Sequence, residues 1–203
     1  MATSINVVER AKSVCMSPDS TWAAIANERT DAAPLITGYV LPLAGAAAVA
    51  QAIGFAVVGQ NLGLLGTYRM PVMSALGMAV ASLVFAALGV VLMSIIIDAL
   101  APTFGAERSR EQALKVAVYS ATPVWIAGLL QIVPVLGVVA LIGALYALYL
   151  LYLGLPRLMK CPADKSLGYL GTVIACAVVI GIVGSLLIGS VFSVSAPVVP
   201  SSF

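Results

Sequence analysis

The side chain best placed for chemistry in this sequence is Asp98, which ends an uncharged run that begins at residue 70. A carboxylate at the edge of such an apolar stretch either forms a structural ion pair, for which Lys115 is available, or takes part in proton transfer. A proton pathway usually needs a relay of titratable groups, and no second acid lies in any segment apolar enough to span a membrane. We therefore favour an ion pair for Asp98.

Hydroxyl groups surround a proline further along the chain, in Tyr119-Ser120-Ala121-Thr122-Pro123. A proline inside a helix leaves the carbonyl four residues earlier without its donor, and here that carbonyl belongs to Tyr119. In an apolar medium the freed carbonyl needs a partner, such as the hydroxyl of Ser120 or Thr122. Pro123 therefore predicts a helix kink with local polarity, which is either a packing feature or the wall of a cavity.

Three tyrosines, Tyr146, Tyr149 and Tyr152, are spaced so that they share one helix face. Tyr152 suits an anchor at a membrane interface. Tyr146 lies 11 residues before Arg157, which is about 16 Å of helix, so its hydroxyl needs an internal acceptor. We interpret this face as hydrogen bonding between helices, with the polar lining of a groove for lipid or solute as the alternative.

The residue types exclude several classes of protein. The sequence contains no histidine, no pair of carboxylates within an apolar segment and no glycine-rich loop that leads to a lysine. We therefore predict no catalytic residue, no metal site and no cofactor, and we do not expect an enzyme. With 62% hydrophobic and 9% charged residues, against about 25% charged in soluble domains, a soluble domain is excluded as well.

Helices that cross a membrane must position these side chains. Four runs, residues 32–68, 70–97, 116–156 and 166–203, carry no charge, and a span needs about 20 apolar residues. The third run would reach about 60 Å as one helix, so we expect a hairpin at Pro134. The sequence predicts an all-α bundle of five spans, at about 35–58, 72–97, 116–133, 135–155 and 168–191. The alternative is four spans with a re-entrant hairpin.

The charge distribution predicts the orientation. With five spans, nine Lys and Arg residues fall on the side of the N-terminus, and Arg69 alone falls on the other. The positive-inside rule then places the N-terminus in the cytoplasm. We expect one transmembrane domain at 34–192 and a short extracytoplasmic tail at 193–203. Topology explains the basic residues, so nucleic-acid binding is not predicted.

Residues 1–33 are expected to form a leader of two short amphipathic helices on the cytoplasmic surface. Val8, Ala11 and Cys15 recur at helical spacing in the first, and Ser17-Pro18-Asp19 begins the second as an N-cap serine with a proline at the first helical position. Trp22 suits the headgroup zone. The leader either orients the first span or serves as a docking platform for a partner.

Small residues recur every four positions in the last span, at Gly181, Ser185 and Gly189. This spacing favours close helix packing, within the chain or against a second copy.

The motifs of the third to fifth spans resemble those of the Yip (Ypt-interacting-protein) family in its compact bacterial form. They are Tyr119-Ser120-x-x-Pro123 and the stretch from Tyr146 to Lys165 that contains Gly154-Leu155-Pro156-Arg157 and Lys160-Cys161-Pro162. The resemblance implies five helices with a cytoplasmic N-terminus, in the bacterial inner membrane. In eukaryotes the family is associated with Rab-type GTPases. Those members carry a long polar N-terminal region and an Asp-Leu-x-Gly-Pro-like signal, whereas this chain has a short leader and Asp31-Ala-Ala-Pro34. GTPase binding is therefore not carried over.

We expect a non-enzymatic adaptor or organiser of other membrane components, with membrane lipids and a membrane or membrane-associated protein as partners. Trp22, Lys160, Pro162 and Lys165 are the candidate contacts. The alternative is a small permease or lipid-handling transporter with a groove around Pro123, Tyr146 and Tyr149.

Overall fold

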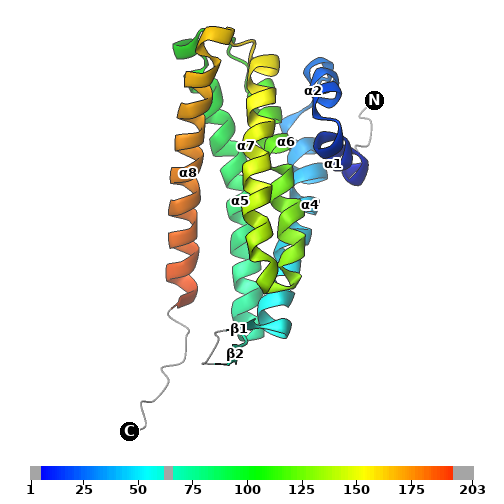
Figure 1. The fold of residues 1–203 in the computed structure, drawn as a ribbon, viewed down its shortest axis with the longest axis vertical. Coiled ribbons are helices and arrows are strands. Elements are labelled where there is room, and N and C mark those ends of the chain that lie inside the picture. The colour runs from blue at the N-terminus through cyan, green and yellow to red at the C-terminus, as the bar shows by residue number, and fades with distance from the viewer. Residues whose placement is uncertain (1–5, 62–65, 194–203) are drawn as a thin grey trace.

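The computed structural model describes residues 6–61 and 66–193, which form a bundle of long helices (Figure 1). Five helices are long and apolar enough to cross a membrane, at Ala32–Val58, Val72–Phe104, Arg110–Ile132, Pro134–Met159 and Ala163–Ser190. The prediction of five spans is confirmed. The hairpin at Pro134 joins two helices that are each long enough to span, which favours five spans over four with a re-entrant hairpin. The tail expected at 193–203 lies, beyond Ser193, outside the described residues.

Short elements begin the chain and connect the spans. The leader forms α1 (Val7–Met16) and α2 (Pro18–Asn27), and the first span contains α3 (Ala32–Leu35) and α4 (Leu41–Ile53), each followed by a π-helical turn, Ile36–Val40 and Gly54–Val58. The other spans are α5 (Val72–Leu100), α6 (Arg110–Leu129), α7 (Val138–Met159) and α8 (Ala163–Ser193). Between the first two spans, β1 (Gln60–Asn61) pairs antiparallel with β2 (Thr67–Tyr68).

Helix α6 lies at the centre of the bundle. In the membrane-spanning stretch of α6, 67% of the residues are buried, whereas in the other four spans at most 33% are buried. The largest buried side chains of the bundle include Trp22, Tyr39, Tyr119 and Tyr169, all near the end that carries the leader. Alanines of α4 and α5 fill the opposite half. The bundle is therefore held by aromatic packing at one end and by the close approach of small residues at the other.

The outer faces of α5, α7 and α8 are covered by exposed aliphatic side chains. Examples are Val80 and Leu88 on α5, Leu141 and Leu145 on α7, and Leu186 on α8. Acyl chains would solvate such a surface, because lipid tails are as apolar as these side chains. Such a belt is typical of the lipid-facing surface of a polytopic membrane protein.

Helix α8 lies at the edge of the bundle (Figure 1) and contacts it near both ends. The Tyr169 hydroxyl donates to the Ile97 carbonyl at 2.5 Å, and its ring stacks on Phe104 at 5.2 Å. Towards the other end, Gly184 lies so close to the Phe85 ring that an added Cβ would overlap it. The contact glycine is therefore Gly184, whereas Gly181, of the predicted small-residue face, has open space around it.

Candidate functional site

The leader packs into the bundle at the end where the charged residues gather. Trp22 of α2 is 1% exposed and meets the edge of the Tyr119 ring at a centroid distance of 6.4 Å. Its indole also lies directly over Gly154, where an added Cβ would be 2.9 Å from the ring. The buried indole corrects the expectation that Trp22 contacts lipid or a partner at the surface, because protein atoms cover it.

Helix α1 presents only part of its predicted apolar face to the bundle. Ala11 is buried as expected and Val14 is buried as well, whereas Val8, expected on the same face as Ala11, is 77% exposed. The Cys15 carbonyl accepts a hydrogen bond of 2.7 Å from the Tyr146 hydroxyl of α7. The acceptor that Tyr146 needs inside the membrane is thus supplied by the leader.

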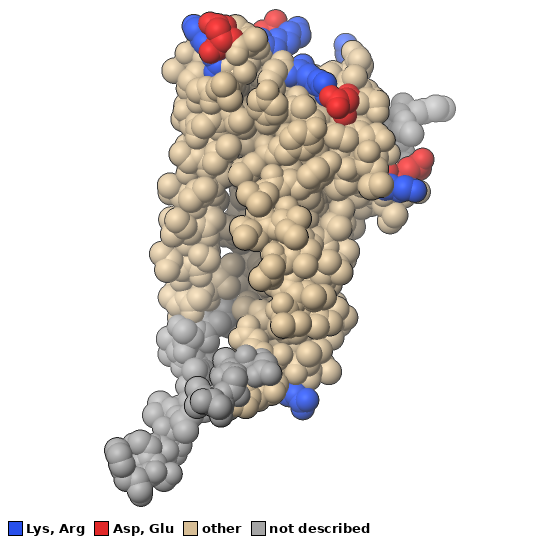
Figure 2. All heavy atoms as spheres, in the orientation of Figure 1, with Lys and Arg blue, Asp and Glu red and all other residues tan. Residues whose placement is uncertain are grey.

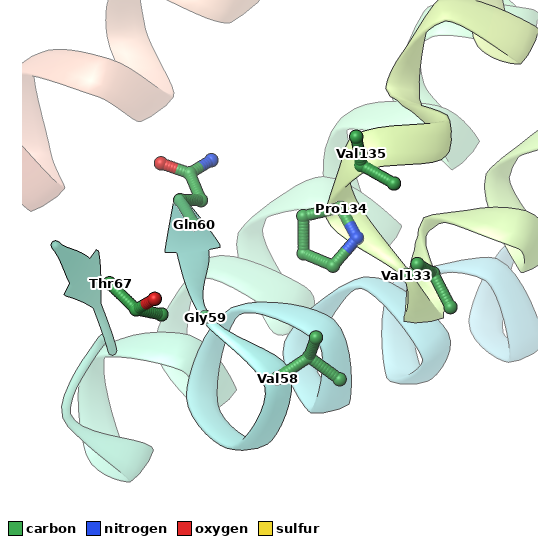
Figure 3. Close-up of a pocket in the computed structure, with 7 residues that line it drawn as sticks. All are labelled: Val58, Gly59, Gln60, Thr67, Val133, Pro134 and Val135. Carbon is green, nitrogen blue, oxygen red and sulfur yellow. The ribbon is translucent and has the colours of Figure 1, made fainter. Parts of the chain in front are cut away.

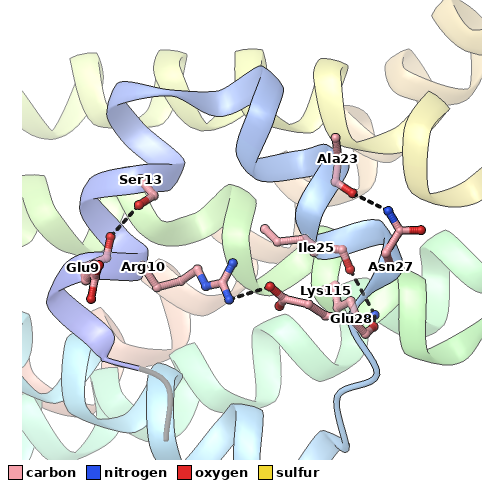
Figure 4. A network of polar contacts seen from close by, with 8 residues as sticks. All are labelled: Glu9, Arg10, Ser13, Ala23, Ile25, Asn27, Glu28 and Lys115. Atoms are coloured by element: carbon pink, nitrogen blue, oxygen red, sulfur yellow. Dashed lines mark hydrogen bonds and ion pairs between the residues drawn. The ribbon is translucent and has the colours of Figure 1, made fainter. Parts of the chain in front are cut away.

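Lys115 of α6 joins the leader to the centre of the bundle (Figure 4). Its side chain is fully buried, and its Nζ donates to the carbonyls of Ile25, at 3.3 Å, and Glu28, and pairs with Glu111 at 2.8 Å. The two carbonyls belong to the C-terminal end of α2, where backbone acceptors lack helical donors and a cation is favoured. The expectation that Lys115 faces Asp98 is wrong, because its ammonium points at this helix end.

Further polar contacts surround the buried lysine. Gln112 of α6 donates to the Ala26 carbonyl at 3.1 Å, and the Thr30 amide donates to Glu111 at 2.9 Å. Within the leader, Arg10 and Glu28 form an ion pair of 2.7 Å (Figure 4). The end of α2 and the segment that follows it are therefore fixed to the start of α6.

The Tyr-Ser-x-x-Pro motif lies beneath the leader. Tyr119 is fully buried against Tyr39, at a centroid distance of 5.1 Å, and the Arg10 guanidinium lies 5.9 Å from its ring centre. The next turn holds a hydrogen bond of 2.9 Å between Tyr39 and Thr122. Among the described residues, the hydroxyls of Tyr119 and Ser120 have no hydrogen-bond partner. The motif thus serves leader docking through the ring of Tyr119.

The surroundings of Pro123 are filled by helix packing. Helix α6 continues through Pro123 to Leu129, and Gly143 of α7 lies against it so closely that an added Cβ would be 2.8 Å from the Pro123 carbonyl oxygen. Tyr149 and Tyr152 are 45% and 46% exposed on the outer face of α7. Tyr146 is engaged by α1 and Pro123 by α7, so packing within the chain occupies the surroundings of both residues.

Asp98 forms an ion pair, as expected, but its partner is Arg108 instead of Lys115. It is 6% exposed, and one carboxylate oxygen lies 3.3 Å from the guanidinium of Arg108, in the connection between α5 and α6. Its other oxygen has no hydrogen-bond partner within residues 6–61 and 66–193. Asp98 therefore closes an ion pair at the end of α5.

Ion pairs connect three segments into one charged surface, shown at the top of Figure 2. Arg157 of α7 pairs with Asp19 of α2, and Lys160 pairs with Glu107 at 2.8 Å. We call this surface the basic end; it comprises α2, residues 105–109 and residues 157–165. Pro162 and Lys165 are exposed there, beside Gly105 of the α5–α6 connection.

Cys161 lies in the same surface but is itself buried. Its Sγ lies 3.7 Å from the Phe104 carbonyl oxygen, and its burial raises the pKa of the thiol. A thiol with a raised pKa stays protonated at neutral pH and reacts slowly. No group of three possible metal-ligating side chains occurs in the part of the chain that the structure describes.

The sequence did not reveal Lys115 and Gly154 as the residues that hold the leader. A lysine five residues into α6, counted from Arg110, looks like any charge at a membrane boundary, and Gly154 looks like a tolerated helix glycine. The available signal was the glycine within the tyrosine stretch, because a helix glycine allows a neighbouring group to approach closely, and Trp22 is one of only two large indole side chains in the sequence.

These features define a polytopic helical membrane protein with an N-terminal leader packed into its bundle. The family model of the Yip1 domain matches residues 12–194. The match spans nearly the whole chain, so the chain belongs to the Yip1 domain family, as its motifs predicted. Neither a curated protein nor a solved structure matches the chain significantly.

Proposed function

We propose that this protein is a non-enzymatic adaptor or organiser of other components of a bacterial inner membrane, with its N-terminus in the cytoplasm and the basic end as its working surface. The observation that carries the proposal is the docked leader. Contacts through Lys115, Trp22 and Arg157 bring α2 beside the two connections, so that three segments distant in sequence form one surface. One partner could contact all three segments of such a surface at the same time.

The partners proposed are anionic lipid and a membrane or membrane-associated protein. Lys160 and Lys165 are exposed at this surface, and each basic residue near a membrane contributes about 1 kcal/mol of attraction to anionic lipid. The permease alternative lacks a comparable observation, because helix and leader packing occupy the surroundings of Pro123 and Tyr146.

Removing both lysine charges is expected to weaken association at the basic end without unfolding the protein. Lys160 has a φ of +49°, so asparagine, which tolerates the left-handed conformation, is the suitable replacement. For Lys160→Asn with Lys165→Gln we expect a loss of about 10- to 30-fold in association, which corresponds to about 2 kcal/mol. The measurement is quantitative mass spectrometry of protein and lipid that co-purify with the chain in native nanodiscs.

Lys12→Gln is the matched control, because it removes one exposed positive charge of α1, outside the basic end. A co-purifying protein or anionic lipid that is depleted in the double variant and retained in Lys12→Gln supports the proposal. An unchanged composition in the double variant contradicts it. A preparation that carries only an enriched small molecule would instead make liposome flux, with Pro123→Ala and Tyr146→Phe, the next assay.

A further inference from the structure

A cavity of about 440 Å³ opens at the end of the bundle opposite to the basic end. It lies between the β1–β2 hairpin and the turn at Pro134, as Figure 3 shows. Its lining is Val58, Gly59, Gln60, Thr67, Val133, Pro134 and Val135. The volume lies within the range of small-molecule sites, and apolar walls with a few polar groups are typical of them.

Arg69 lies against Gly59, a residue that lines this cavity, and is the one charged residue of the sequence between Asp31 and Asp98. Figure 2 shows a single basic patch at the lower end of the molecule, far from the other charges. Gly59 brings the arginine there: its φ is +83°, and an added Cβ would be 2.8 Å from both Arg69 Cγ and Thr67 Cγ2. The glycine therefore lets the arginine stem pass directly over a residue that lines the cavity.

The surroundings of the cavity are apolar. Val57, Val135 and Leu136 are 63%, 82% and 39% exposed beside it. Such a rim suits contact with acyl chains, and arginine at the edge of this region can extend its guanidinium towards the headgroups. A divalent cation would find no carboxylate here, because residues 32–97 contain no acid.

We propose that this cavity is a binding site for one diacyl phospholipid of the adjacent leaflet. An acyl chain occupies the space between Val58 and Val133, and the Arg69 guanidinium donates to phosphate oxygens, which match its planar set of donors. The Gln60 amide and the Thr67 hydroxyl are the neutral donors available to the ester carbonyls. The site lies away from the basic end and does not depend on the adaptor role.

Native mass spectrometry of the delipidated full chain, titrated with phosphatidylglycerol and with phosphatidylethanolamine, tests the site. We expect one tightly held phospholipid of either kind per chain. Val133→Trp, which fills the cavity, and Arg69→Gln should each weaken this binding about tenfold or more, as expected for one charge-assisted contact. Arg69→Lys should retain most of it, and Lys165→Gln at the basic end should retain all of it.

Oleate is the probe for the apolar part of the site alone. Oleate that binds as tightly as phospholipid and ignores Arg69→Gln would overturn the phosphate contact. Phospholipid binding that persists in Val133→Trp, and in Val58→Phe as a second filling variant, would overturn the cavity assignment. Thermal unfolding of each variant confirms that it is folded, and because the lysines of the basic end are unchanged in these variants, a failure here leaves the adaptor proposal untouched.

Discussion

Replacing Lys115 by methionine is expected to release the leader and to lower the free energy of unfolding by about 1–3 kcal/mol. The lysine is fully buried and donates to the carbonyls of Ile25 and Glu28. Without it, the Ile25 carbonyl keeps the Glu28 amide as its donor, but the Glu28 carbonyl loses the lysine, and an acceptor left without a partner in the interior costs about 1–3 kcal/mol. Unfolding in mixed micelles measures the loss, and trypsin cleavage after Lys12, which lies inside helix α1, measures the release of the leader.

Two controls separate the role of Lys115 from that of charge in general. Glu111→Gln removes its half-exposed ion-pair partner but leaves both carbonyl contacts, so we expect a cost below about 1 kcal/mol. Arg110→Gln changes an exposed neighbour and should have no effect. A Lys115→Met protein with wild-type stability and an equally protected Lys12 would show that the buried contact does not hold the leader.

Gly154→Leu is expected to expel Trp22 and to destabilise the protein by about 3–5 kcal/mol, the usual cost of losing a large buried aromatic. An added Cβ at this glycine lies 2.9 Å from the indole, which is otherwise 1% exposed. In a Trp125→Phe background, the emission of Trp22 should shift to the red as the indole leaves the core. Gly171→Leu is the matched control, because nothing lies within 4 Å of that position.

A double-mutant cycle gives the sharper test of the same contact. Trp22→Ala alone should cost a similar 3–5 kcal/mol, but in Trp22→Ala with Gly154→Leu the leucine can occupy the vacated space. The double variant should therefore lose much less unfolding free energy than the two single variants lose together, because the residues are in direct contact. Full additivity would show that Trp22 and Gly154 do not share an interface.

The membrane-spanning part of the fold could be predicted because the bilayer imposes it on the sequence. Uncharged runs between Asp31, Arg69, Asp98 and Arg157 leave no other place for the helices, and Pro134 divides the longest run. The helices extend beyond the predicted bounds at the basic end, where α6 begins at Arg110. Hydropathy marks where the apolar stretch begins, whereas the backbone stays helical through the charged turn that precedes it.

The docking of the leader could not be predicted, because it depends on contacts between side chains and a distant backbone. Spacing along the chain shows that Lys115 is near a membrane boundary, but not that the end of α2 lies above it. The buried face of α1 was predicted only in part, for a related reason. An amphipathic helix is assigned its apolar face as if lipid covered it, whereas the bundle covers Ala11, as predicted, and Val14, and leaves Val8 exposed.

The central claim is that the docked leader and the two connections form one working surface in the membrane. A short bis-maleimide applied to Asp19→Cys with Arg157→Cys, in a chain without its three native cysteines, tests it in native membranes, because these side chains form an ion pair across α2 and α7. Asp19→Cys with Arg69→Cys, at opposite ends, is the control. We predict rapid and nearly complete cross-linking within one chain, with partner association at the basic end retained. Failure to cross-link, or a locked protein that loses the association, would contradict the account.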